Sequence, residues 1–176
     1  IVNAIRILKN TDARIKGAEI DGRLRLGQGT TISADLGFTD AKVHDAANVS
    51  NGQKLPYIPR VTWGVSFDQS FELGAGKLDF VANYSWRSKW WSVMEDPSVA
   101  ASAAQPSEEV VSSIRSLGLL NLSLTYANGP YSLTAYANNV TDEKSYGFIT
   151  YTSAGAINYG SLGMPRVIGV RARYSF

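Results

Sequence analysis

The last ten residues, Val167-Ile168-Gly169-Val170-Arg171-Ala172-Arg173-Tyr174-Ser175-Phe176, alternate between apolar and polar side chains. One set of alternate positions holds Ile168, Val170, Ala172, Tyr174 and Phe176, and the other holds Gly169, Arg171, Arg173 and Ser175. Because successive side chains of a β-strand point to opposite faces, this spacing predicts a strand with one apolar and one polar face.

The same alternation recurs upstream and predicts an all-β protein of about seven antiparallel strands. The expected strands cover residues 12–27, 30–45, 58–72, 77–91, 113–128, 131–141 and 163–176. Most of them exceed the ~9 to 11 residues that cross a bilayer at a tilt. We therefore expect transmembrane strands, with Ala172 and Leu122 facing lipid and Arg171 and Ser123 facing the lumen of a barrel.

The connections between these strands alternate in length. Short turns are expected at 27–29, 74–76 and 128–130, and long loops at 46–57, 92–112 and 142–162. Within the second long loop, Pro106-Ser107-Glu108-Glu109 predicts either a capped helical turn or an irregular loop. Short turns on one rim and long loops on the other are typical of outer-membrane barrels. The aromatic residues expected near the two rims are Tyr126, Tyr131, Tyr174 and Phe176 on the short-turn side, and Trp86 and Trp90 on the long-loop side.

Composition excludes several other classes. No window approaches the ~20 consecutive apolar residues of a membrane helix. The net charge of +2 is too small for a nucleic-acid partner, and the absence of cysteine excludes disulfides and thiolate chemistry. His44 has no partners at the spacing of a catalytic triad or metal site, so we expect a solvated residue, no enzyme activity, no metal and no cofactor. An outer-membrane hydrolase is therefore a weak alternative.

Charged residues on the polar face have a simple expected role. We expect its carboxylates to form ion pairs with its arginines in the lumen, where charge is tolerated. The carboxylates are Glu19, Asp21, Asp35, Asp68, Glu72 and Asp79, and the arginines are Arg23, Arg25, Arg87, Arg171 and Arg173.

Four short motifs carry a family resemblance. The C-terminal stretch resembles the last strand of outer-membrane barrels, in which the final aromatic residues, here Tyr174 and Phe176, belong to a signal read by the barrel assembly machinery. The segment 138–143, Asn-Asn-Val-Thr-Asp-Glu, is similar to the Asn-Leu-Thr-Asp segment of TonB-dependent receptors, and Pro165-Arg166 follows it. Residues 13–20 resemble the Gly-x-Glu strand of these receptors, and residues 55–60 resemble their Leu-Pro-x-x-Pro motif.

This resemblance implies that residues 1–176 are the C-terminal part of an about 22-stranded barrel in the bacterial outer membrane, with the plug domain outside this chain. The N-terminus lacks an initiator Met and a signal peptide, as expected for part of a longer protein. The implied function is TonB-energised uptake of a scarce nutrient such as a ferric siderophore. The implied partners are outer-membrane lipid, the TonB complex through the missing N-terminal regions, the barrel assembly machinery, and a small-molecule or metal-chelate ligand.

Aromatic residues on or beside the long loops are the candidate ligand contacts, although some of them could instead be girdle residues. They are Tyr57, Trp90, Trp91, Tyr146, Phe148, Tyr151 and Tyr159. Two alternatives for the whole chain stay open at this point. One is a complete eight-stranded barrel, a structural protein or passive pore, with an additional strand from residues 1–10. The other is a soluble antiparallel sandwich whose apolar face is simply its core.

Overall fold

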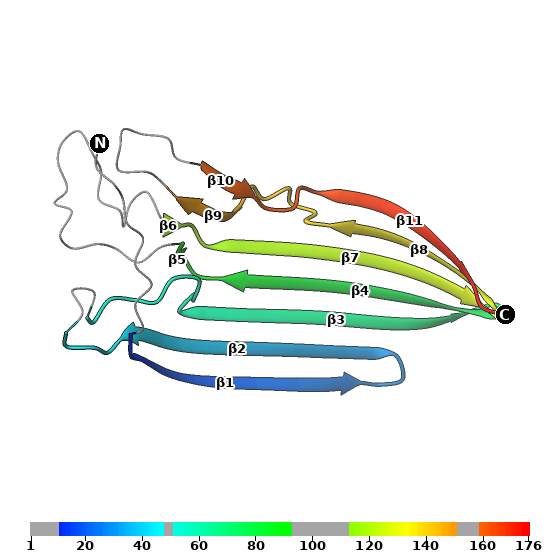
Figure 1. Ribbon diagram of the computed structural model, residues 1–176. Helices are drawn as coiled ribbons and strands as arrows, with labels where there is room; N and C mark the ends of the chain where they lie inside the picture. The colour runs from blue at the N-terminus through cyan, green and yellow to red at the C-terminus, as the bar shows by residue number, and fades with distance from the viewer. Residues whose placement is uncertain (1–10, 48–50, 93–112, 151–158) are drawn as a thin grey trace.

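The computed structural model describes residues 11–47, 51–92, 113–150 and 159–176, and every regular element within these ranges is a β-strand (Figure 1). A seven-stranded sheet contains β1 (Ala13–Leu26), β2 (Thr30–Val43), β3 (Val61–Leu73), β4 (Gly76–Arg87), β7 (Leu117–Asn128), β8 (Tyr131–Asn138) and β11 (Val167–Tyr174). Two short hairpins pair β5 (Trp90–Trp91) with β6 (Ser113–Ile114), and β9 (Tyr146–Thr150) with β10 (Tyr159–Leu162).

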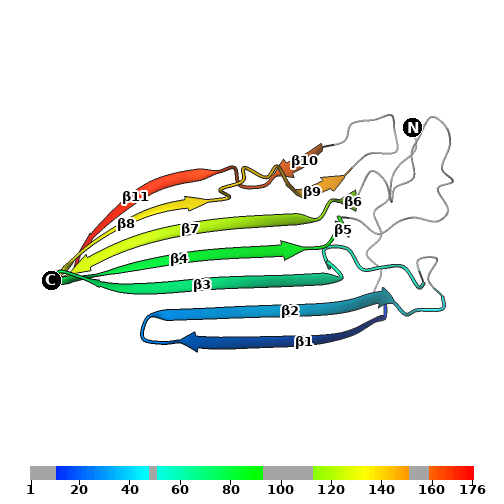
Figure 2. The ribbon, with the colours of Figure 1, turned by 180° about the vertical axis from the view of Figure 1, so that it is seen from behind.

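The sheet is a single antiparallel meander with its strands in chain order (Figures 1 and 2). Short turns join β1 to β2, β3 to β4 and β7 to β8, and each contains a glycine at positive φ: Gly27 at 65°, Gly74 at 62° and Gly129 at 55°. Glycine adopts this conformation without the steric cost that a Cβ brings. β1 and β11 are the two edges, so the described sheet is open. The additional strand that a closed eight-stranded barrel requires would come from residues 1–10, which lie outside the described residues.

The strand register carries the two-residue period across the whole sheet. Because paired residues of neighbouring strands share a face, each register row lies on one face of the sheet. One row is entirely apolar and runs through Leu24, Ile32, Phe67, Ala82, Leu122, Ala137 and Ile168. The next row lies on the opposite face and is mostly polar, through Arg25, Thr31, Asp68, Val81, Ser123, Tyr136 and Gly169. Leu122 and Ala172 thus lie on the apolar face, and Ser123 and Arg171 on the polar face, as expected.

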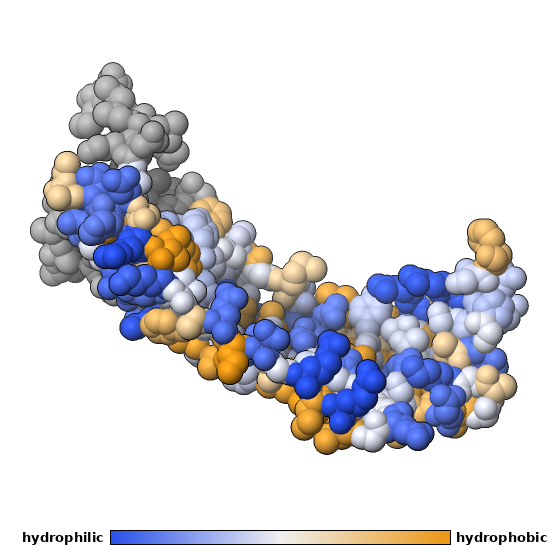
Figure 3. All heavy atoms as spheres, turned by 90° about the horizontal axis from the view of Figure 1, so that it is seen from below, coloured by the Kyte–Doolittle hydropathy of each residue, from blue (hydrophilic) through white to orange (hydrophobic). Residues whose placement is uncertain are grey.

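The apolar face is exposed instead of buried. Among its residues, Ile20 is 69%, Ile168 74% and Val170 68% accessible. Figure 3 shows the sheet edge-on as a curved wall with hydrophobic residues along its convex margin. A soluble sandwich would cover this face with a second layer. The described residues form only one layer, so the sandwich alternative is wrong.

Aromatic rows bound the apolar face at both ends. Near the long connections, Trp63 lies beside Tyr84 and Trp86, with ring centroids 5.2 and 6.2 Å away. Near the short turns, the rings of Tyr131 and Tyr174 lie 5.1 Å apart. The distance between the two aromatic rows can be counted along β7, which pairs with both. Trp86 pairs with Gly118 and Tyr131 pairs with Asn128, so the rows are ten residues apart. This separation is about 34 Å along a strand, or about 24–28 Å at the usual tilt, which matches the apolar band of an outer-membrane barrel.

Several predicted strands are wrong at their long-loop ends, and one loop contains unpredicted structure. The strand expected at 77–91 ends at Arg87, because Ser88 closes the ladder with Val61 and the chain then turns into β5. The strand expected at 113–128 is divided into β6 and β7, and the expected loop at 142–162 contains the β9–β10 hairpin. Trp90 is therefore not a girdle residue of the sheet, since it is buried in β5 and pairs with Ile114. The candidate helical turn at 106–109 lies outside the described residues.

The motif at 138–143 has a clear structural role. The strand expected to run to residue 141 ends at Asn138, because Asn139 and Asp142 both take left-handed φ values, 51° and 53°. The buried Asn139 amide donates to the carbonyls of Glu143, at 3.0 Å, and Met164, at 3.2 Å, and accepts from the Glu143 N–H at 2.9 Å. Asp142 accepts a hydrogen bond from the Arg166 N–H at 3.3 Å. We call this the Asn139 clasp, because it ties the end of β8 to the entry of β11.

Candidate functional site at the long-loop rim

The long connections between sheet strands gather at one end of the sheet, and the C-terminus lies at the other (Figure 1). The connection from β2 to β3, the β5–β6 pair and the β9–β10 hairpin are all at this long-loop rim. Ser92, which follows β5, donates a hydrogen bond to the Ile149 carbonyl of β9, so the two hairpins are neighbours. This rim is where most of the predicted aromatic site residues lie.

Three of the predicted residues come together at the rim. The Tyr57 N–H donates to the Trp91 carbonyl at 2.8 Å, and the Tyr57 and Trp90 rings lie 5.1 Å apart. Tyr57 has a φ of 62° and is 54% exposed, whereas Trp90 is buried. The Leu-Pro-x-x-Pro segment at 55–60 therefore places the Tyr57 side chain against β5, which lies about thirty residues further along the chain.

The side chains of Trp90 and Trp91 lie on opposite faces of the sheet. The Arg87 guanidinium lies 4.9 Å from the Trp90 ring, and Arg87 pairs with Thr62 on the polar face. The Nζ atoms of Lys54 and Lys89 lie 4.3 and 5.2 Å from the Trp91 ring, and Lys54 pairs with Lys42 on the same face as the apolar side chains. Because adjacent residues in a strand point to opposite faces, Trp90 belongs to the concave side and Trp91 to the convex side.

We call Tyr57, Arg87 and Trp90 the inner rim cluster. Arg87 Nη1 and Trp90 Nε1 are buried and have no hydrogen-bond partner in the described part of the chain. A buried donor without an acceptor costs about 1–3 kcal/mol, more when it is charged. The cluster therefore combines a cationic side chain, two buried donors and the exposed Tyr57 ring at one place on the rim.

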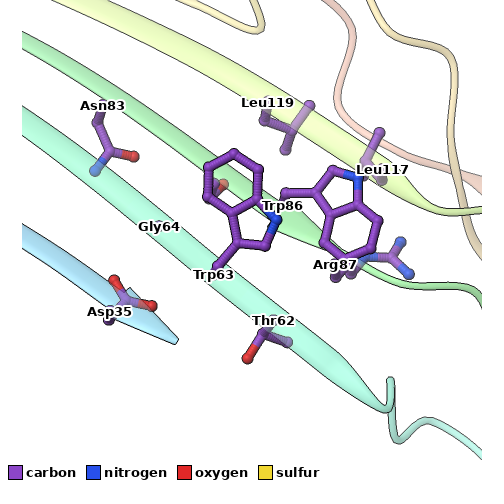
Figure 4. A pocket seen from close by; sticks show the side chains of 10 residues that line it. Asp35, Thr62, Trp63, Gly64, Asn83, Trp86, Arg87, Leu117 and Leu119 are labelled. Carbon is purple, nitrogen blue, oxygen red and sulfur yellow. The ribbon is translucent and has the colours of Figure 1, made fainter. Parts of the chain in front are cut away.

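A pocket of about 280 Å³ lies on the concave face directly beside this cluster (Figure 4). Arg87 lines it together with Asp35, Thr62 and Asn83, which come from neighbouring strands. The carboxylate of Asp35 lies over Gly64, where a Cβ atom would come within 2.6 Å of Oδ1. The residues of this pocket are dispersed over four strands and only the strand register brings them together, so no local sequence pattern indicates the pocket.

The remaining predicted aromatic residues occupy the second hairpin or fall outside the description. Tyr146 and Phe148 lie on β9, where Tyr146 is 46% exposed. Tyr159 opens β10 and pairs with Thr150. Tyr151 lies outside the described residues. The structure therefore separates the six described candidates into an inner pair, Tyr57 and Trp90, a convex residue, Trp91, and three residues of the neighbouring hairpin.

The predicted carboxylate–arginine pairs on the polar face are wrong. Within the described ranges, none of them forms an ion pair, and Asp79 instead pairs with Lys77 at 2.9 Å. The register places the arginines beside other groups: Arg23 Nε donates to Ser33 Oγ at 3.3 Å, and the Arg171 guanidinium lies 5.7 Å from the Tyr136 ring.

His44 is exposed, as expected. Within the described part of the chain, no group of three or more His, Cys, Asp or Glu residues is arranged to hold a metal ion. That part also has no helix long and apolar enough to span a bilayer.

A curved antiparallel wall, apolar on its convex face and polar on its concave face, with short turns at one rim and long connections at the other, defines the class of outer-membrane β-barrels. The chain belongs to the family of TonB-dependent receptor-like β-barrels, whose family model matches residues 3–140. It is thus a protein of the Gram-negative outer membrane. A comparison with curated protein sequences gives no match.

Two solved structures share the fold. The ferric yersiniabactin uptake receptor FyuA of Yersinia pestis matches with a TM-score of 0.78 and 15% identity over 93% of this chain and 24% of that one. BauA, the ferric preacinetobactin receptor of Acinetobacter baumannii, matches with a TM-score of 0.69 and 15% identity over 96% of this chain and 23% of that one. The chain therefore spans about a quarter of the length of these receptors.

Proposed function

We propose that the intact protein takes up a scarce nutrient, such as a ferric siderophore, across the outer membrane with energy from the TonB system. The family and the two ferric-siderophore receptors of like fold support this proposal. Residues 1–176 would supply the C-terminal part of the barrel wall, and a plug domain outside this chain would close the lumen and engage TonB. No bond is made or broken in this process.

The inner rim cluster is the observation that carries the proposal. It places Arg87 Nη1 and the Trp90 indole N–H, both buried and without partners in the described residues, at the long-loop rim, where Arg87 also lines a concave pocket. Iron chelates present several oxygen acceptors around the metal, and many carry negative charge. Such a ligand would stack on the exposed Tyr57 ring and be attracted by the Arg87 charge, and it would accept from the two buried donors once the rim side chains rearrange around it.

The proposal can be tested by iron-limited growth and by uptake of labelled ferric chelates in a deletion strain that expresses the intact receptor. We expect growth on at least one chelate to require the receptor and a functional TonB system. Arg87→Gln should weaken binding of that chelate about ten-fold, because it removes a charge-assisted hydrogen bond. Arg173→Gln, at the short-turn end of the same face, is the matched control and should bind normally.

Two outcomes contradict different parts of the proposal. Normal chelate affinity in Arg87→Gln, with uptake retained, would exclude the inner rim cluster as the binding site. If no ferric chelate or other scarce nutrient requires the receptor for uptake, the transport function itself is wrong.

β11 would provide the closing edge of the intact barrel. Unpaired backbone groups cost several kcal/mol each in hydrocarbon, so both sheet edges require partner strands in the membrane. The exposed Tyr174 and Phe176 side chains lie at the short-turn end, 6.4 Å apart between ring centroids. We propose that the assembly machinery reads these two residues before β11 pairs with the first strand of the barrel.

A further inference from the structure

Three basic residues stand side by side across the convex face at the long-loop rim. The register pairs Arg14 of β1 with Lys42 of β2, and an isolated bridge pairs Lys42 with Lys54. Like charges directly opposite each other on neighbouring strands are destabilising. A row of three cations is therefore an unfavourable arrangement unless an anion lies against it.

Further cations extend this row on the same face. Lys16 lies two residues from Arg14 on β1, and the Arg60 guanidinium lies 5.1 Å from the Phe38 ring. Lys89 joins Lys54 over Trp91. We call this set the basic belt: Arg14, Lys16, Lys42, Lys54, Arg60 and Lys89.

The belt has little acidic compensation. Asp40, which pairs with Lys16 in the register, forms the one described ion pair with a belt residue, at 3.3 Å from Lys42 Nζ. Arg14 and Lys16 are exposed and form no ion pair within the described ranges. Arg14, Lys16, Asp40 and Lys42 also line a hollow of about 370 Å³, together with His44 and Asn51. The belt thus combines largely uncompensated positive charge with a hollow between its side chains.

The height of the belt places it just outside the hydrocarbon. Lys16 lies four residues beyond Ile20, whose row across the sheet contains Trp63 and Trp86 at the upper end of the apolar band. Four residues correspond to about 14 Å along a strand, or about 10 Å along the membrane normal. Long basic side chains can extend down to lipid headgroups from this position. Because the face is convex, the belt points outward into the membrane environment and not into the lumen (Figure 3).

We propose that the basic belt binds the phosphate groups of a phosphorylated glycolipid in the outer leaflet. The phosphates lie against Arg14, Lys16 and Lys42, and the acyl chains lie against the apolar side chains below, including Phe38, Ile20 and Leu36. This site requires only the outer-membrane position of the barrel and does not depend on the nutrient that is transported.

The test uses the intact receptor in detergent, with binding of diphosphorylated lipid A measured by native mass spectrometry. Each belt cation removed should weaken binding about five-fold, so Lys16→Gln should show about five-fold and the triple variant Arg14→Gln/Lys16→Gln/Lys42→Gln more than fifty-fold weaker binding. Fully dephosphorylated lipid A should bind the wild type and the triple variant equally. The matched control, Arg23→Gln/Arg25→Gln/Arg173→Gln, removes three charges from the concave face and should bind like the wild type.

Three results would overturn the proposal. The first is wild-type affinity for diphosphorylated lipid A in the triple variant, and the second is an equal loss in the concave-face control. The third is competition by inorganic phosphate at the same concentration as the lipid, which would indicate a site for free anions. Heat-modifiable gel mobility reports whether each variant is folded, and if the triple variant is not, the single Lys16→Gln variant decides the question.

Discussion

Replacing Asn139 by alanine should destabilise the protein more than most single substitutions at its surface. The Asn139 side chain makes three hydrogen bonds, two as donor to the carbonyls of Glu143 and Met164 and one as acceptor from the Glu143 N–H. The residue is only 4% exposed, so water cannot readily replace these bonds. Because Asn139 joins the end of β8 to the entry of β11, its loss should loosen the last strand in particular.

The magnitude follows from two separate effects. Three hydrogen bonds at about 1 kcal/mol each contribute about 3 kcal/mol. The φ of 51° adds about 1 kcal/mol, because alanine tolerates the left-handed region less well than asparagine. Asn139→Ala should therefore lower the free energy of unfolding by about 4 kcal/mol. Asn139→Gly removes the hydrogen bonds without the steric cost, so the expected loss is about 3 kcal/mol.

Urea unfolding of the intact receptor in detergent measures these changes, and hydrogen exchange at the Glu143 amide reports the clasp directly. Exchange at that amide should accelerate in Asn139→Ala and Asn139→Gly. Asn128→Ala, at the exposed last residue of β7, is the matched control and should change stability by less than about 0.5 kcal/mol. A loss below about 1 kcal/mol in Asn139→Ala, or unchanged exchange at Glu143, would refute the assigned role of the clasp.

Three further predictions follow from the faces, the clasp and the open edges. Ala82→Arg, midway along the convex apolar band, should lower the free energy of unfolding in lipid by about 2–4 kcal/mol. Ser123→Lys, on the concave face, should lower it much less. Equal losses for the two variants in unfolding titrations would exclude the assigned orientation of the faces. Hydrogen bonds from the Lys144 ammonium, and then from the Arg166 N–H, hold the pKa of Asp142 below its ordinary value of 3.8. The ionised carboxylate therefore stabilises the clasp fully above about pH 3.8, and this stabilisation is lost as the pH falls through the lowered pKa of Asp142. Melting temperatures of wild type and Asp142→Asn should therefore differ at neutral pH and converge in acid, and a constant difference would contradict this. Residues 1–176 refolded alone in detergent should form oligomers or aggregates, because the seven strands of the described sheet cannot close by antiparallel pairing. A monodisperse, heat-modifiable monomer in gel and mass measurements would instead support the eight-stranded alternative.

The sequence by itself determined the fold class and the orientation of the strands. The alternation around Leu122 and Ser123, repeated at Ala172 and Arg171, assigned each residue to a face, because the two-residue period is a local property of an extended chain. Glycine turns and long connections also indicated which rim carries the candidate site. The motif at 138–143 indicated the family, although its role in the clasp became visible only through the contact of Asn139 with Met164.

Only the tertiary structure decided which side chains act together at the rim. Trp90 and Trp91 are adjacent in sequence, yet one joins Tyr57 and Arg87 on the concave side and the other joins Lys54 and Lys89 on the convex side. The row of Arg14, Lys42 and Lys54 likewise arises from pairing between separate segments. These arrangements depend on hydrogen bonds between distant parts of the chain, such as the bond from the Tyr57 N–H to the Trp91 carbonyl. The local spacing of apolar residues does not specify which distant segments pair, so the sequence alone could not reveal these arrangements.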